Sequence, residues 1–188
     1  MHLFRDGKIL YQVIDITGPG IRQASKGKRR AVEQNKLEPC GIQVDEDGDW
    51  FYHGNRIFRP DILEDFYSKL DRLLSGEFIL SDFNGLCRLD VADTPFVVSS
   101  VDLQKNEAGN EQIIIRLKNL SRSEVLDPET LTTGRENILY CRVACGRFSA
   151  RFSRPAYYQL AGFIREDESG EGFYLELNGN RHFIAGIC

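Results

Sequence analysis

Two arginines that each precede a proline are the residues whose type and spacing best indicate chemistry. Arg59-Pro60 and Arg154-Pro155 lie 95 residues apart. Proline is favoured in the first turn of a helix, where backbone N–H groups are unpaired and the helix dipole is positive. An arginine at that position adds its guanidinium donors, so each pair predicts a site for an anion such as phosphate or a carboxylate.

The second arginine is the stronger candidate. Asp61 and Glu64 follow Arg59 closely enough to neutralise its charge. The same positions after Arg154 hold no acid, so its guanidinium is expected to have spare capacity for an anion. The alternative is that both arginines pair with carboxylates and hold a strand to a helix.

Three further polar residues are candidates for ligand binding. Arg151 and His182 are expected to reach the pocket of Arg154. Asp93 begins the sequence Asp93-Thr94-Pro95-Phe96, which places a carboxylate at a rigid turn between two strands. The alternative for Asp93 is a side chain that forms the turn through its own backbone.

One aromatic residue, Trp50, completes the set of candidates. Together with Tyr52 and His53 it could line a pocket, but alternation along a hairpin more often makes one face core and the other surface. The three histidines and five cysteines form no cluster with the spacing of a metal site. No catalytic residue, metal or cofactor is therefore predicted.

The charge distribution bears on the partner class. The net charge is −4, but residues 22–36 carry +5, which leaves −9 on the remainder. An acidic body argues against a nucleic-acid binder, because phosphate contacts need a basic face. The basic segment either grips an acidic partner or is a solvated run of charge.

Composition and cysteine usage predict the compartment. The longest apolar runs are far too short to cross a bilayer, and residues 1–6 lack the features of a secretory signal. The five cysteines are odd in number and widely scattered. We therefore expect reduced thiols and a cytoplasmic protein without a membrane partner.

A repeat with a spacing of 95 residues predicts the architecture. Between residues 56 and 80 and their counterparts there are five identities, where composition gives about one or two. Deleting one residue then brings Asn84-Gly85 onto Asn178-Gly179. The repeat indicates one strand–helix–strand unit used twice.

The predicted fold class is α+β: two small, mostly antiparallel β units, each with one helix, from an internal duplication. One helix is expected from Pro60 to Leu74 and the other from Pro155. About ten strands surround them. The predicted organisation is an N-terminal extension with a basic segment at 1–40, a first repeat at 41–104 and a second at 105–188.

Three separated strings of residues resemble an uncharacterised bacterial family, domain of unknown function 1285. They are Gly48 to Pro60, Asp90 to Phe96 and Arg151 to Leu160, and the similarity covers about residues 38–188. The resemblance implies two small α+β units built from a repeated motif, and a role in signalling or small-ligand sensing. It brings no activity and no catalytic residues.

Three functions remain open from the sequence. The first is a non-enzymatic binding or sensing protein that takes a small anionic ligand or a protein partner near Arg154, at the junction of the repeats. The second is an enzyme, a hydrolase or transferase, that uses Asp93 and an arginine. The third is an interaction adaptor that uses its basic N-terminal arm.

The first forty residues are predicted to be separable from the fold, because the composition shifts at Pro39-Cys40 and the resemblance begins there. Deleting residues 1–38 should leave the thermal midpoint nearly unchanged in a melting experiment. A fall of about ten degrees or more, on a scale of about 2–4 °C per kcal/mol, would show instead that this segment is integral.

Overall fold

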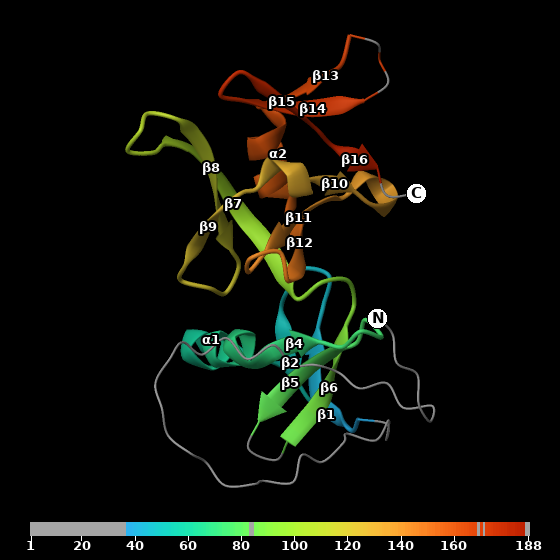
Figure 1. Cartoon of the computed structure of the whole chain (residues 1–188). Helices are drawn as coiled ribbons and strands as arrows, with labels where there is room; N and C mark the ends of the chain where they lie inside the picture. The colour runs from blue at the N-terminus through green and yellow to red at the C-terminus, as the bar shows by residue number, and fades with distance from the viewer. Residues whose placement is uncertain (1–36, 83–84, 169, 171, 187–188) are drawn as a thin grey trace, which may run out of the picture. The chain divides into compact units, whose positions relative to one another are not determined.

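The computed structural model describes residues 37–82, 85–168, 170 and 172–186. From Glu38 onward the chain forms one compact unit of three sheets and two α-helices in its described part (Figure 1). The predicted α+β class with mostly antiparallel pairing is confirmed. None of the helices in these ranges is long and apolar enough to span a membrane.

Sheet A has six strands and carries the first repeat. Its order is β3-β2-β1-β6-β5-β4, and all pairs are antiparallel except β1 with β6. Helix α1 follows β3 and precedes β4. The elements are β1 (Pro39–Val44), β2 (Trp50–Tyr52), β3 (Asn55–Arg56), α1 (Pro60–Lys69), β4 (Leu70–Arg72), β5 (Phe78–Asp82) and β6 (Gly85–Val91).

Sheet B has seven strands in the order β16-β10-β11-β12-β7-β8-β9. Its strands are β7 (Phe96–Lys105), β8 (Glu111–Leu117), β9 (Ser123–Val125), β10 (Thr132–Thr133), β11 (Leu139–Val143), β12 (Phe148–Phe152) and β16 (Ala185–Gly186). Two short 3-10 helices, Pro128–Thr130 and Arg135–Asn137, flank β10. Strand β7 pairs with β8 and β12, while the predicted repeat boundary after residue 104 stays a prediction.

Sheet C is a three-stranded meander that follows the second helix. It contains β13 (Ile164–Glu166), β14 (Phe173–Leu177) and β15 (Asn180–Phe183) after α2 (Arg154–Ala161). Asn178, in the turn between β14 and β15, ties this sheet to β8. Its side chain accepts from the Glu111 N–H at 2.6 Å and donates to the Glu111 carbonyl at 2.8 Å.

The two repeats share one order of elements and one register. Each has a hairpin, a helix and then a three-stranded meander. The pair Ile79–Arg88 in the first meander corresponds to Tyr174–Phe183 in the second, and all four residues keep the spacing of 95. This agreement across two strand pairs is what an internal duplication predicts.

Two details of the sequence prediction are wrong. The spacing of 95 continues through the turn, since Asp82–Gly85 matches Leu177–Asn180, so no residue is deleted. Helix α1 ends at Lys69 rather than Leu74. Leu70 fits both the helical spacing of apolar residues and a strand. Pairing with Leu80 buries it in the β4–β5 hairpin, while Leu74 is exposed. Tertiary pairing therefore overrides the helical spacing.

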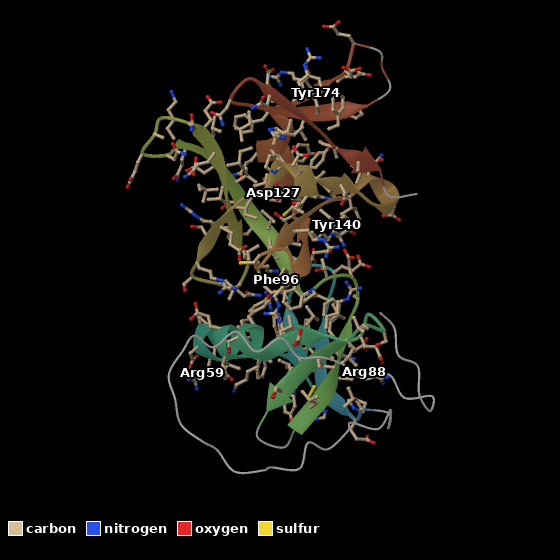
Figure 2. All side chains as sticks on the ribbon, in the orientation of Figure 1. Arg59, Arg88, Phe96, Asp127, Tyr140 and Tyr174 are labelled. Atoms are coloured by element: carbon tan, nitrogen blue, oxygen red, sulfur yellow. A yellow bond between two sulfur atoms is a disulfide. The ribbon has the colours of Figure 1, made fainter. Side chains whose placement is uncertain are left out.

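A single hydrophobic cluster runs through both large sheets. Aromatic rings make the connection, with centroids 5.0 Å apart for Trp50 and Tyr67, 4.9 Å for Tyr67 and Phe96, and 5.1 Å for Phe96 and Phe148. These separations are typical of stabilising aromatic pairs. Phe96 lies where sheet B begins (Figure 2).

The Tyr67 hydroxyl is the polar centre of this cluster. It accepts from the Trp50 indole N–H at 3.0 Å and donates to the Pro95 carbonyl at 2.9 Å. All three residues are buried. Burial raises the pKa of Tyr67 to about 12, so the hydroxyl keeps its proton and its donor role.

A disulfide joins Cys40 and Cys87, which corrects the expectation of reduced thiols. Strands β1 and β6 are neighbours, and this brings together two cysteines 47 residues apart with Cα atoms at 5.1 Å. Spacing along the chain cannot reveal a contact that depends on strand order. Cys141 is a buried free thiol, while Cys145 is a free thiol exposed in the turn after β11.

We expect Tyr67→Phe to destabilise the protein although it keeps the ring. It leaves the Trp50 N–H and the Pro95 carbonyl buried without partners, at about 1–3 kcal/mol for each group. Urea denaturation measures the loss in free energy of unfolding. Tyr52→Phe is the matched control, because Tyr52 is exposed and its hydroxyl makes no hydrogen bond to a described residue. Equal stability of the two variants would contradict the role of the Tyr67 hydroxyl.

Replacing both bridged cysteines, Cys40→Ser with Cys87→Ser, should lower the free energy of unfolding by about 2–4 kcal/mol, since the disulfide restricts the unfolded chain. Cys145 is free and exposed, so Cys145→Ser is the control and should leave the free energy of unfolding nearly unchanged. Alkylation of the denatured protein without reductant should leave Cys40 and Cys87 unlabelled. Labelling of both would show that the bridge does not form.

Candidate functional site

A pocket of about 360 Å³ lies where the β4–β5 hairpin of sheet A faces β10, β11 and β12 of sheet B. We call it the arginine–threonine pocket. Its volume is at the lower end of the range of about 300–1,000 Å³ for small-molecule sites. The residues that bear on its chemistry are Arg72, Asp93, Thr130, Thr132, Tyr140 and Arg142.

Alternation along β11 supplies one wall. Leu139, Cys141 and Val143 point into the core, so Tyr140 and Arg142 share the opposite face. The register then places the partners of Tyr140, which are Thr132 on β10 and Arg151 on β12, on that same face. A polar strip thus crosses three strands. Its central residue, Tyr140, is labelled in Figure 2.

Glycine permits the position of the Tyr140 ring. A Cβ atom at Gly134 would lie 2.8 Å from the ring, closer than side chains tolerate. Gly134 also donates its N–H to the Ile138 carbonyl at 2.8 Å, which closes the connection before β11. The backbone around the pocket is therefore fitted to this tyrosine.

Asp93 is held by two groups from this wall. The Tyr140 hydroxyl donates to Asp93 Oδ2 at 2.9 Å, and Arg151 contacts the same oxygen at 3.4 Å. Arg151 also lies 3.7 Å from Glu46. Burial raises the pKa of Tyr140 to about 12, and the hydrogen bond to Asp93 adds to this, so Tyr140 stays a donor.

The β4–β5 hairpin supplies the opposite wall. Arg72 pairs in register with Phe78, and its guanidinium lies over the Phe78 ring at 5.4 Å. Its Nε donates to the Gly76 carbonyl at 3.0 Å. These contacts orient Arg72 without neutralising it, since no described carboxylate pairs with its guanidinium.

The pocket therefore has a surplus of positive charge. Arg142 also makes no ion pair with any residue in the described ranges; its backbone N–H donates to Thr130 Oγ1 at 3.1 Å. Asp93 is the one carboxylate among the residues named above, and Arg151 balances it. Two guanidinium groups, on Arg72 and Arg142, remain uncompensated.

A larger hollow of about 840 Å³ lies over β1, β5 and β6. It shares Arg72, Phe78 and Asp93 with the arginine–threonine pocket. Its charges are closer to balance. Arg88 lies 3.5 Å from Glu77, and Asp90 adds a further carboxylate that accepts from Gln43 at 3.4 Å. It lacks the positive surplus of the arginine–threonine pocket.

The two arginines first singled out lie outside the pocket. Arg59 is exposed at the start of α1 and forms an ion pair with Asp61 at 2.5 Å (Figure 2). That hydrogen bond holds the pKa of Asp61 below its ordinary value. Glu64, expected beside Arg59, instead accepts from Ser121.

Arg154 is the first residue of α2, is exposed, and pairs with no carboxylate of the described residues. The cap of this helix is Ser153, whose Oγ accepts from the Ala156 N–H at 3.3 Å. One of the free N–H groups at this end is therefore already satisfied. In the acidic loop, Asp167 lies 3.7 Å from Arg181.

The remaining candidates have different surroundings. His182 Nδ1 lies 2.5 Å from Glu129 Oε1, while Arg151 contacts Asp93, so the structure does not join them in one pocket with Arg154. Trp50 is fully buried and belongs to the core. Asp93 and Arg151 are the two predicted residues that meet.

Sequence reasoning missed Arg72, Arg142 and Tyr140. The alternation of apolar and polar residues in β11 is a signal that could have found the last two. Arg72 carries no such signal, because it falls within the apolar pattern that predicted a longer helix. No group of three or more His, Cys, Asp or Glu side chains in the described residues could hold a metal ion.

Comparison with solved structures identifies the fold. A DUF1285 family protein from Silicibacter pomeroyi DSS-3 is 22% identical with a TM-score of 0.63, over 79% of this chain and 80% of that one. A second, from Shewanella baltica OS155, is 17% identical with a TM-score of 0.53, over 64% and 90%. No family model and no curated protein matches. The chain therefore has the fold of DUF1285 family proteins, the family its sequence resembles.

Proposed function

We propose that the protein binds a small anionic ligand in the arginine–threonine pocket, and that it does so as a binding or sensing protein. The observation that carries this is the pair Arg72 and Arg142, which line one pocket and have no carboxylate partner among the described residues. Guanidinium groups match carboxylates and phosphates with two parallel hydrogen bonds. A signalling role belongs to the same proposal.

The pocket offers an anion more than one kind of donor. Arg72 and Arg142 are both exposed, so their attraction for an anion depends on two guanidinium groups acting together on one ligand rather than on burial. The Thr132 hydroxyl also lines the pocket and makes no hydrogen bond to another described residue. An anion can therefore receive donors from both walls.

The alternatives from the sequence have less support. A site at Arg154 stays a prediction, but it offers one exposed guanidinium at a capped helix end. An enzyme would use Asp93 with an arginine; these two do meet, yet Arg151 and Tyr140 engage the carboxylate and favour a positioning role. A protein partner and an adaptor role for the basic segment at residues 22–36 stay predictions from the sequence, and that segment falls outside the described residues.

The disulfide bears on the compartment. The cytoplasmic expectation rested on reduced thiols, whereas disulfides persist mainly in oxidising compartments. The bridge between Cys40 and Cys87 therefore removes that argument, and supports a location in which thiols become oxidised.

A melting assay with phosphate, sulfate and acetate tests the function. At a hundredfold excess over Kd, binding stabilises the protein by about 2.7 kcal/mol, which corresponds to about 5–10 °C at this chain length. We expect Arg72→Ala and Arg142→Ala each to reduce this shift strongly, since each removes one guanidinium.

Two matched variants locate the site. Arg116→Ala removes an exposed arginine of β8 that forms no ion pair with a described residue, and should leave the shift unchanged. Arg154→Ala should also leave it unchanged. A shift that survives both pocket variants but disappears in Arg154→Ala would contradict the pocket and place the anion at α2.

A further inference from the structure

The arginine–threonine pocket contains one carboxylate with an unused oxygen. Tyr140 and Arg151 both contact Oδ2 of Asp93. No hydrogen bond from a described residue reaches Oδ1, and the side chain is 27% exposed. Asp93 therefore presents a hydrogen-bond acceptor to the same space that Arg72 and Arg142 line.

The position of this carboxylate is fixed by the chain around it. The adjacent Thr94 donates its hydroxyl to the Ser149 carbonyl of β12, and the Pro95 carbonyl accepts from Tyr67. Thr94 is buried. The two residues after Asp93 are thus anchored to β12 and to helix α1, which leaves little freedom to turn the carboxylate away.

The polar groups of the pocket divide into two kinds. Arg72 and Arg142 carry guanidinium donors that pair with no carboxylate among the described residues, and such groups suit the carboxylate of a ligand. Asp93 Oδ1 is an acceptor, and Tyr140 donates its proton to Oδ2, so its oxygen can also accept. An ammonium group has three donors and no acceptor, and matches that second set.

We propose that the ligand is a small zwitterion, an α-amino acid in its simplest form. Its carboxylate pairs with Arg72 and Arg142, and its ammonium group binds Asp93 Oδ1 and the Tyr140 oxygen. This rests on the proposed anion-binding function and narrows it. Arg151 balances the charge of Asp93, but a ligand with negative charge alone supplies no donor to Oδ1, whereas the ammonium group of a zwitterion does, and this favours the zwitterion.

Ligand pairs test the idea on the unmodified protein. A melting screen of the twenty amino acids first selects the one that stabilises the protein most. Calorimetric titration then compares the affinity of the protein for this amino acid with its affinity for the analogue without the amino group, such as propionate for alanine. The amine without the carboxylate is titrated in the same way. We expect the amino acid to bind at least tenfold more tightly than either analogue, about 1.4 kcal/mol. Equal affinity of the amino acid and the acid would overturn the zwitterion while anion binding stands. If no carboxylate binds but phosphate or sulfate does, the zwitterion falls and anion binding stands; if none of these anions binds, both proposals fall.

Two variants assign the ammonium site. Asp93→Asn should reduce the affinity for the amino acid at least tenfold and leave that for the deaminated acid equal or higher. Tyr140→Phe keeps the carboxylate and should retain the preference for the amino acid over the acid. If Asp93→Asn does not fold, the comparison of amino acid and deaminated acid on the wild-type protein still tests whether the ligand is a zwitterion. An unchanged preference in folded Asp93→Asn would refute the role of Asp93.

Discussion

The structure depends on one buried hydroxyl group. Tyr67 comes from the helix of the first repeat, accepts from Trp50 in the neighbouring hairpin and donates to Pro95, where the chain enters sheet B. Its ring also packs against Phe96. The same residue therefore satisfies polar groups and connects the aromatic core of both large sheets. The hydrogen bond from Tyr67 to Pro95 also helps to position Asp93, which lies two residues earlier in the chain.

Duplication and divergence explain how the pocket arises. Both repeats retain the register of the meander, but the first closes onto β1 through β6, while the second forms a separate sheet and sends β16 to β10. The equivalent arginines also differ: Arg56 pairs with Asp49, and Arg151 with Asp93. The pocket combines the hairpin of one repeat with the outer face of the other, so neither repeat contains it alone.

Sequence reasoning succeeded where the signal is local. The proline-led helix starts, the repeat and the α+β class depend on neighbouring residues and on composition, and these were predicted. It failed where the outcome depends on strand order: Leu70 fits a helix and a hairpin equally well, and Cys40 meets Cys87 through the parallel pairing of β1 and β6. For the candidate site, Asp93 and Arg151 were identified, but their contact requires β12 to lie beside β7. No sequence pattern indicates that Arg72 and Arg142, which come from different sheets, line the same pocket.

The disulfide also changes how the chain responds to pulling. It closes a ring that contains the first hairpin, helix α1 and strand β5, and this ring lies between residues 40 and 87. A force on the two ends of an oxidised chain cannot extend that segment, which hides roughly 150 Å of contour length, at about 3.3–3.6 Å per residue. The second repeat has no such ring among its described residues and can be drawn out fully. Two units of common origin thus differ in mechanical extensibility, and a reductant would make them alike.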